Sequence, residues 1–432
     1  MIGGWVKMKT NKTKHLTSKF ICLFMLFTLL LTISSCSAGE LKVESKNLMA
    51  EVESDVVWGN ELDDKFIKAA ANFSIELFKE SVSYGRNSLV SPISVMQSLS
   101  FLGNGANNET RTQIELILGD NITIDEFNKY FYTIINDLNY SEEEKVFIGN
   151  SLWIKDSKNI KISETFLKTN AEYYYSDFYK SAFDETTAKD INKWIKVKSD
   201  NKIKSIYMSF DENTYMNLIN TSTFDAEWQI PYKSNNIMEN DFTSIDETTT
   251  KIEMLKSFEK KLLSDDNAKG FMKPYSSEKY SFIALMPNDD TSIESYINSL
   301  TGEKFLKIIE NQSIGGIIVT FPKFDCESTL DLTNVLKNIG LTSIFSETAD
   351  FSNLGNDEEN NIYLSKVYSK SFLSVNKKGT KSGWVIEAGT MPSQFDMIDS
   401  STLTIDKPFI YAIIDNNTNL PIFIGAVVNI DS

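Results

Sequence analysis

The chain has 432 residues, of which 41% are hydrophobic and 12% aromatic, enough apolar material for one large domain or two ordinary ones. Its formal net charge is −16 at pH 7. A surface that acidic repels phosphate backbones, so the composition argues against nucleic acid as a partner.

Residues 1–36 have the composition of an export signal. Several lysines precede the apolar run 20–33 (FICLFMLFTLLLTI), and Ser34, Ser35 and Cys36 follow it. A basic start, a short apolar run and small residues are typical of a signal peptide, and the run is too short for a comfortable membrane span. The end of the segment, Leu31 to Cys36, resembles a bacterial lipobox, whose cysteine becomes the lipid-modified first residue after cleavage.

We therefore expect an exported protein, extracellular or at the cell surface, that is anchored to a membrane by lipid on Cys36. The alternative is a plainly secreted protein in which Cys36 is an ordinary residue of the signal. Met8 could equally be the true start, and the sequence does not indicate which membrane leaflet would hold the lipid.

Removing this segment leaves few reactive side chains. The only histidine, His15, lies in the signal, as does Cys22, so with Cys36 lipidated only Cys326 remains. The mature chain then has no intramolecular disulfide, no Cys/His metal site and no histidine proton shuttle. We expect Cys326 to be a small core residue, and we expect no metal and no cofactor.

The rest of the chain indicates a tether followed by one α+β domain. Residues 37–61 are polar and aperiodic, which predicts a flexible tether. Helical spacing begins after Leu62, a second helix starts at Pro92, and later apolar runs end in a C-terminal hairpin over 409–428. Helices followed by strands and mixed segments predict one α+β domain over 62–432. The acidic runs 142–144 and 357–359 are interpreted as solvated loops.

Several stretches, taken in order, are similar to segments of the serpin family. They are 87–94 (NSLVSPIS), 105–110, 150–154 (NSLWI), 191–203 (INKW, then KI), 224–231, 322–324 (PKF), 341–351, 375–380 (VNKKGT), 406–409 (DKPF) and 423–425 (FIG). One departure is Asp225-Ala226, which stands where Lys-Gly is usual. Each stretch is modest evidence alone, but their order and separations over 62–432 resemble a serpin.

The resemblance implies a serpin fold of three β-sheets and about nine helices, with an exposed reactive loop near 379–397. It also implies that the protein is not an enzyme but a monomeric inhibitor of serine or cysteine endopeptidases. In the family mechanism the protease forms an acyl-enzyme with the loop, the cleaved loop inserts as a new strand of the main sheet, and the tethered protease is distorted. The native state is then kinetically trapped above a more stable form.

The resemblance also assigns the hinge that begins the loop. Its residues are Gly379, Thr380, Lys381, Ser382, Gly383 and Trp384. Insertion puts alternate residues on opposite faces, and in the family the threonine face goes inward, which leaves the charges of Lys381 and Glu387 outside. Three features oppose insertion: Trp384 stands where small residues are usual, Lys377 and Lys381 stand where glutamate is usual, and glycines weaken a strand. The runner-up function is therefore a non-inhibitory serpin that acts as a surface binding or scaffold lipoprotein.

The scissile bond has two candidates, because the loop is slightly longer than usual. Counting forward from Gly379 gives Ser393-Gln394, and counting back from Pro408 gives Met397-Ile398. These residues favour elastase-, chymotrypsin- or subtilisin-like targets. Trypsin-like targets are disfavoured, since no Arg or Lys lies between Lys381 and Lys407.

Overall fold

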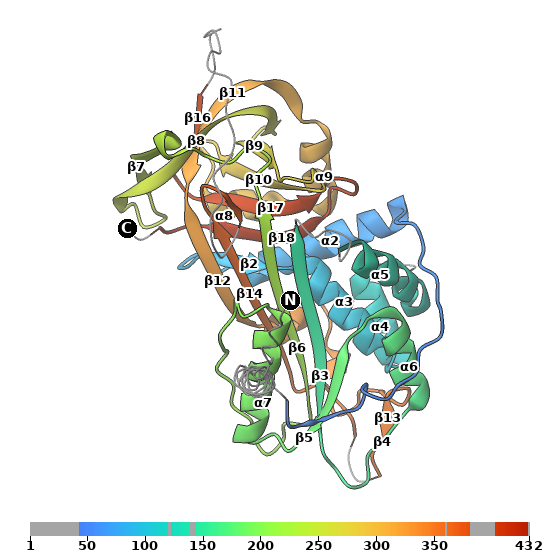
Figure 1. Cartoon of the computed structure of the whole chain (residues 1–432). Coiled ribbons are helices and arrows are strands. Elements are labelled where there is room, and N and C mark those ends of the chain that lie inside the picture. Colours follow the sequence, from blue (N-terminus) through green and yellow to red (C-terminus); the bar gives the residue numbers. More distant parts are fainter. Residues whose placement is uncertain (1–42, 120–121, 139–143, 359–360, 381–401, 431–432) are drawn as a thin grey trace, which may run out of the picture. The chain divides into compact units, whose positions relative to one another are not determined.

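The computed structural model describes residues 43–119, 122–138, 144–358, 361–380 and 402–430 (Figure 1). Within these ranges lie three β-sheets and nine α-helices, which confirms the expected α+β fold. The helices are α2 (Asp64–Ser81), α3 (Pro92–Gly103), α4 (Asn108–Leu118), α5 (Ile124–Leu138), α6 (Glu164–Tyr173), α7 (Glu185–Lys198), α8 (Ile293–Ser299), α9 (Gly302–Glu310) and α10 (Leu332–Asn338).

A seven-stranded sheet forms the lower half of the view in Figure 1. Its strands, in spatial order, are β1 (Lys46–Asn47), β5 (Asp177–Ser181), β3 (Lys145–Lys155), β6 (Met216–Glu227), β15 (Gly379–Thr380), β14 (Lys366–Val375) and β12 (Phe324–Asp331). Strands distant in sequence are therefore neighbours: β6 and β14 pair in parallel although about 150 residues separate them.

A nine-stranded sheet occupies the upper half of the same view. Its main path is β16 (Thr402–Thr404), β11 (Ser313–Pro322), β8 (Thr249–Ser264), β9 (Ala268–Pro274), β10 (Tyr280–Pro287), β17 (Phe409–Asp415), β18 (Pro421–Val427) and β2 (Ser88–Val90), and β7 (Ile237–Thr243) pairs with β8. The predicted C-terminal hairpin is confirmed as β17 and β18. The third sheet joins β4 (Lys161–Ile162) to β13 (Gly355–Asn356).

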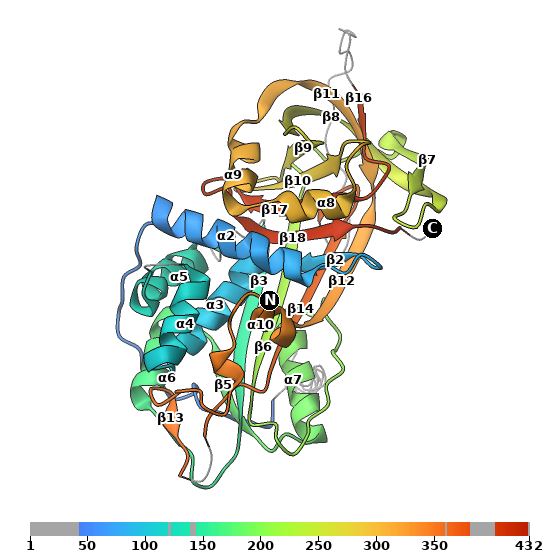
Figure 2. The ribbon, with the colours of Figure 1, turned by 180° about the vertical axis from the view of Figure 1, so that it is seen from behind.

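Helices cover both faces of the seven-stranded sheet (Figures 1 and 2). On one face lies α3, every residue of which is buried, with α2, α4 and α5 beyond it. On the other face lies α7, whose Ile191, Trp194 and Ile195 form a separate apolar cluster with Trp153 of β3 and Ile219 of β6. Each strand of the sheet centre is therefore buried on both sides.

Local sequence explains the opening helix. Asp63 caps α2 by accepting a hydrogen bond from the Phe66 amide at 2.9 Å, and Phe66, Ala70 and Leu77 recur on its buried face. That hydrogen bond, followed by one from the Tyr130 hydroxyl, lowers the pKa of Asp63. The predicted helical start near residue 62 is thus confirmed.

The N-terminal strap, residues 43–61, differs from the flexible tether expected over 37–61. Its strand β1 pairs with β5, and the amide of Leu48 donates to Phe178 O at 2.7 Å. The buried carboxylate of Asp190 on α7 accepts hydrogen bonds from the Ser45 amide (2.7 Å) and the Ser45 hydroxyl (2.8 Å). Further along, the Asn60 amide donates to Lys129 O at 3.1 Å. The strap is therefore part of the packed domain, which begins at Val43 rather than at residue 62. Residues 37–42 lie outside the described ranges.

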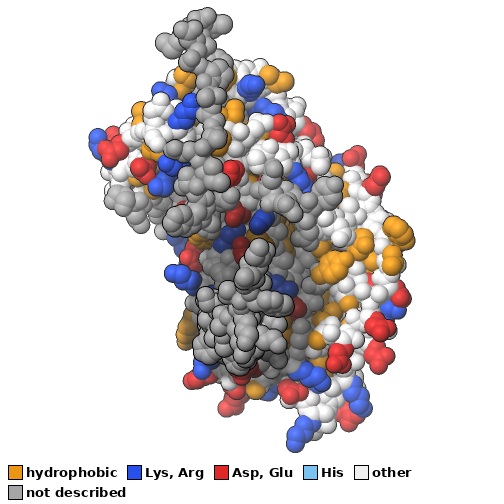
Figure 3. All heavy atoms as spheres, viewed as in Figure 1, with side chains coloured by type: hydrophobic (Ala, Val, Ile, Leu, Met, Phe, Trp, Pro, Cys, Tyr) orange, Lys and Arg blue, Asp and Glu red, His pale blue; other side chains and the backbone are white. Residues whose placement is uncertain are grey.

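Two acidic positions expected to be solvated are buried. Glu144 is 0% exposed and accepts a hydrogen bond from the Ser277 amide at 2.7 Å, and Asp357 accepts one from the Tyr215 hydroxyl at 2.5 Å. The interpretation of these two residues as solvated is wrong, because distant donors reach them. Elsewhere on the face seen in Figure 3, acidic and basic side chains are interspersed.

Cys326 is 3% exposed and unpaired, and burial raises the pKa of its thiol to about 11, which confirms a core role. Across the described ranges, none of the helices combines the length and hydropathy needed to cross a bilayer. Those same residues contain no group of three or more side chains arranged to hold a metal ion.

Candidate functional site at the hinge of the seven-stranded sheet

The structure describes only the first part of the expected reactive loop. Gly379 and Thr380 are in strand β15, and β16 begins at Thr402 on the far side of the loop. The other expected site residues lie outside the described ranges; they are Lys381, Ser382, Gly383, Trp384, Ser393, Gln394, Met397, Ile398 and Cys36. The site is therefore built from the hinge and the strands around it.

At the hinge the chain turns back into the sheet that it has just left. Strand β14 ends at Val375, the Asn376 amide donates to Gly379 O at 2.9 Å, and Gly379 and Thr380 then run antiparallel to β14. On the other side Gly379 pairs with Glu227 and Thr380 with Ala226 of β6. A Cβ on Gly379 would lie 2.0 Å from Ala226 O, so only glycine fits this close approach.

An aromatic pair, two backbone amides and one indole N–H hold the turn. Thr380 is 0% exposed, and its hydroxyl lies 2.7 Å from the Tyr275 hydroxyl. Burial raises the pKa of Tyr275 well above its ordinary value, so this phenol stays neutral. The Tyr275 ring stacks on Trp228 at 4.6 Å, and the Trp228 amide and indole N–H donate to Lys378 O and Asn376 O, both at 2.8 Å. The Tyr232 amide completes the set by donating to Lys377 O at 2.8 Å.

A buried ion pair lies behind these rings. Lys273 Nζ is 2.8 Å from Glu259 Oε1, and the two side chains are only 4% and 6% exposed. The same ammonium lies 4.7 Å from the centre of the Tyr232 ring and 5.6 Å from that of Trp228, within cation–π range. The hinge thus rests on a rigid polar and aromatic base whose charges compensate each other.

Below the hinge, β6 and β14 close on each other along a seam. Seven residue pairs form the parallel ladder, from Asn217 opposite Lys366 to Thr223 opposite Phe372. Short polar side chains bridge it: Ser369 donates to Asn220 Oδ1 at 3.1 Å, and the hydroxyls of Ser222 and Ser371 lie 2.9 Å apart. Above Thr223 the strands part, and β15 lies between them. The seam is therefore closed along most of its length and open where the loop begins.

Sequence reasoning located Gly379, Thr380 and the segment around Trp228 but missed Tyr275, the Lys273–Glu259 pair and the seam. A signal existed for the ion pair, since Lys273 interrupts the otherwise apolar segment 270–275 (GFMKPY). The seam carries no such signal, because serine and asparagine are ordinary surface residues until a fold buries them.

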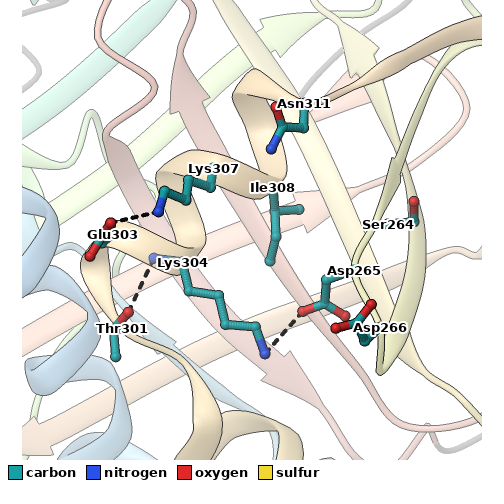
Figure 4. Close-up of a pocket in the computed structure, with 9 residues that line it drawn as sticks. All are labelled: Ser264, Asp265, Asp266, Thr301, Glu303, Lys304, Lys307, Ile308 and Asn311. Carbon is teal, nitrogen blue, oxygen red and sulfur yellow. Dashed lines mark hydrogen bonds and ion pairs between the residues drawn. The ribbon is translucent and has the colours of Figure 1, made fainter.

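A surface hollow between α9 and the β8–β9 turn is a second candidate site, in this case for binding a small molecule (Figure 4). Lys304 Nζ crosses it to Asp265 Oδ2 at 3.0 Å, and Glu303 pairs with Lys307 along α9 at 2.6 Å. The hollow is open and lined mostly by charged side chains, three carboxylates and two lysines, so it offers little to an apolar ligand.

Comparison with known proteins agrees with this architecture. The sequence model of the family described as serpin (serine protease inhibitor) matches residues 68–430. Alpha-1-antiproteinase 2 of Equus caballus is 27% identical over 426 residues, which cover 94% of this chain and 97% of the horse protein. The chain belongs to the serpin family.

Solved structures of relatives allow the conformation of this chain to be compared with native and latent serpins. The thermophilic serpin tengpin in its native state is 41% identical, with a TM-score of 0.86 over 90% of this chain and 100% of tengpin. The latent state of the same protein gives only 0.76, over 86% of this chain and 100% of that one. Thyroxine-binding globulin, solved in complex with thyroxine, is 26% identical, with a TM-score of 0.75 over 84% of this chain and 99% of the globulin. The described arrangement therefore resembles native more than latent tengpin.

Proposed function

We propose that this serpin inhibits serine endopeptidases by inserting its cleaved reactive loop into the seven-stranded sheet. The observation that carries the proposal is strand β15: Gly379 and Thr380 already lie between β6 and β14, antiparallel to both. A loop that continued along this line would become a full central strand.

The chemistry of the seam supports the proposal. Insertion must separate β6 from β14, and the side-chain hydrogen bonds that cross between them come from short hydroxyls and amides, beside two apolar pairs, Leu218–Val367 and Ile219–Tyr368. Such groups can exchange a hydrogen bond across the seam for one to a new neighbour at small net cost. Thr380 also points inward to Tyr275, as the expected inward threonine face requires.

For the target we propose an elastase-, chymotrypsin- or subtilisin-like protease, with cysteine endopeptidases as a further class. The proposed scissile bond is Ser393-Gln394 or Met397-Ile398. No Arg or Lys between Lys381 and Lys407 would suit a trypsin-like pocket.

We further propose that the protein is an exported monomer with lipid on Cys36. The strap supports a close attachment, because residues 43–61 pack on the domain and only Ser37 to Lys42 then separate the anchor from the first described residue. Mass spectrometry of the membrane-extracted chain tests the anchor: a diacyl adduct on Cys36 supports it, and an unmodified or uncleaved N-terminus contradicts it.

Incubation with elastase, chymotrypsin and subtilisin tests the inhibitory function. We expect a covalent complex that survives SDS. Mass spectrometry should show that the released C-terminal fragment begins at residue 394 or 398. A panel that yields only cleaved serpin and fully active protease would contradict inhibition.

That negative result would favour the second candidate, a non-inhibitory surface protein. The observation behind it is the likeness to thyroxine-binding globulin, a relative solved with a bound small molecule. The charged hollow of Figure 4 is one place to look for a ligand in this chain, and a polar ligand would have to displace the Lys304–Asp265 pair.

A further inference from the structure

Aromatic and apolar side chains face solvent where the strap crosses from α6 to α5. Val56 is 83% exposed, Trp58 80% and Tyr175 58%, whereas the other tryptophans that the structure describes are at most 2% exposed. Single exposed apolar residues are ordinary on a protein surface, but neighbouring ones mark an interaction surface. The contacts of the strap show which of the two cases applies here.

Two hydrogen bonds fix the stretch of strap that carries the exposed residues. On α6, Glu172 Oε1 accepts from the Asp55 amide at 3.1 Å. On α5, the Lys129 carbonyl accepts from the Asn60 amide at 3.1 Å. Both exposed residues of the strap lie between these two points, so they are held at the junction of the two helices.

Three tyrosines lie along the same junction. Tyr132 of α5 and Tyr173 of α6 are partly exposed, and their rings meet edge to face with centres 6.2 Å apart. Tyr175 follows α6 and precedes Phe178, whose carbonyl accepts a hydrogen bond from the strap at 2.7 Å. Figure 3 shows hydrophobic side chains gathered on the right of the view, where Figure 1 places the strap and α5. We call this set the aromatic patch; its members are Val56, Trp58, Tyr132, Tyr173 and Tyr175.

The exposed charge around the aromatic patch is mostly negative. Glu51, Glu53 and Glu61 are exposed and make no ion pair with any side chain that the structure describes. The Lys168 ammonium is already paired with a strap carboxylate at 2.6 Å, which leaves Lys129 as an exposed positive charge at the edge of the patch. A partner of the patch should therefore offer positive groups beside an apolar layer.

We propose that the aromatic patch rests on the head-group layer of a lipid bilayer rich in zwitterionic phospholipid. Tryptophan and tyrosine have an apolar body and a polar tip, and both are enriched where a membrane meets water. The ammonium groups of zwitterionic lipids are attracted to aromatic faces and to the surrounding carboxylates. Anionic lipids that lack an ammonium group are repelled by the same carboxylates.

This inference rests on the proposed export of the protein and adds a second membrane contact to the proposed lipid on Cys36. It is independent of the proposed inhibition. Strands β16 and β11 lie at the top of the views in Figures 1 and 2, at the other end of the molecule from the first residues of the strap. Contact through the patch therefore leaves the end that carries β16 open to a protease in solution.

Fluorescence of Trp58 in the full chain tests the proposal. Replacing Trp5 and Trp384 with Phe leaves Trp58 as the tryptophan that a quencher can reach, and Trp58→Phe in that background is the blank. In vesicles of phosphatidylcholine and phosphatidylethanolamine, we expect lipid brominated near the head group to quench Trp58. The matched control is Met238→Trp in a Trp58→Phe background, because Met238 is also exposed but lies on β7, away from the strap. Acrylamide in the water should quench Trp58 several-fold less than the tryptophan of that control.

Exchanging half of the lipid for phosphatidylglycerol should reduce the quenching of Trp58 by lipid at low salt, and added NaCl should restore it. Equal acrylamide quenching of Trp58 and of the control would overturn the inference, as would stronger lipid quenching in phosphatidylglycerol. Protection of Trp58 that appears without vesicles as the protein concentration rises would assign the patch to a second copy of the chain and also overturn it. Trp58→Phe should leave the yield of SDS-stable protease complex unchanged, so a missing complex would count against the proposed inhibition and not against the patch.

Discussion

If the register of β15 continued along the loop, Trp384 would lie opposite the smallest side chains of the seam between β6 and β14. Thr380 lies opposite Ala226 of β6 and Val375 of β14, and four residues further along an antiparallel strand Trp384 would lie between Ser222 and Ser371. These are the two serines whose hydroxyls bridge the closed seam at 2.9 Å. The bulkiest residue of the hinge would therefore meet two of the smallest residues of the sheet, and replacing Trp384 with alanine tests how well it fits.

The free-energy change of the proposed insertion can be worked out from the hydrogen bonds of the strand ladder. Insertion of residues 381–389 would break the seven-pair parallel seam and create two antiparallel seams of about nine residues each, a net gain of roughly eleven hydrogen bonds. At about 1 kcal/mol net for each bond, the gain is on the order of 10 kcal/mol. Overpacking by the indole costs about 1–2 kcal/mol, at the low side of the usual range because both neighbours are serines. In the proposed mechanism insertion would thus stay downhill, and Trp384 would act on its rate.

In the proposed mechanism the rate of insertion would decide the outcome, because insertion would compete with hydrolysis of the acyl-enzyme. A barrier lowered by about 1–2 kcal/mol speeds insertion roughly 5- to 30-fold. We therefore expect Trp384→Ala to raise the fraction of protease trapped as covalent complex, and to lower the number of serpin molecules consumed for each protease inhibited.

Quantitative gel analysis after mixing with a chymotrypsin-like protease, supported by stopped-flow loss of protease activity, gives both quantities. Val385→Ala is the control, because this neighbour would face outward and its β-branched side chain favours a strand, so that change should slow insertion or leave it unaltered. An unchanged or smaller trapped fraction in Trp384→Ala would refute the register argument.

Three further changes test other parts of the site. Thr380→Arg places a charge at a fully buried position, so complex formation should fall at least tenfold while cleavage of the loop continues; an undiminished yield would show that the hinge need not enter the sheet. Lys273→Met leaves Glu259 buried and unpaired, so urea unfolding should show a loss of about 3–5 kcal/mol, most of which returns when Glu259 is also replaced by Met; a single variant as stable as the parent would contradict the pairing. Asp190→Asn weakens the strap by about 2 kcal/mol, measured as faster exchange of the strap amides. Burial raises the pKa of Asp190, but hydrogen bonds from Glu44 and Ser45 outweigh it and lower that pKa overall, so the strap is fully held above about pH 4 and is released as the pH falls further. The Asn variant should lack that acid release, and the same release in both proteins would assign it to another group.

The features that sequence predicted correctly are those written in short segments. The helix that begins after Asp63 has its cap and its apolar spacing within a few residues, and the hairpin of β17 and β18 has its turn between two apolar runs. The assignment of Gly379 and Thr380 to a hinge comes from the resemblance to the family and stays a prediction. The inward threonine face is likewise what the resemblance implies, and the structure places the Thr380 hydroxyl 2.7 Å from the Tyr275 hydroxyl.

The features that sequence could not supply depend on partners far along the chain. The strap is held by Asp190, about 145 residues away, and only two of its residues form a strand, so no periodicity marks it. Glu144 is similar: its neighbours in an acidic run suggest solvent, yet the Ser277 amide, 133 residues away, makes burial favourable. In both cases a single carboxylate satisfies backbone donors, and nothing local distinguishes it from an exposed one.

The proposed insertion requires that a closed sheet can still accept a strand, and the seam between β6 and β14 bears on that requirement. Large apolar side chains interlocked between β6 and β14 would make separation expensive, because each would lose its packing before the new strand could replace it. Asn220, Ser222, Ser369 and Ser371 lose only hydrogen bonds, and each can be remade to an incoming strand. The apolar packing of the sheet lies above and below it, against α3 and α7, and includes two pairs of the same ladder, Leu218–Val367 and Ile219–Tyr368. In the proposed insertion, the contacts to be broken would therefore be mainly hydrogen bonds of short polar side chains, with two apolar pairs beside them.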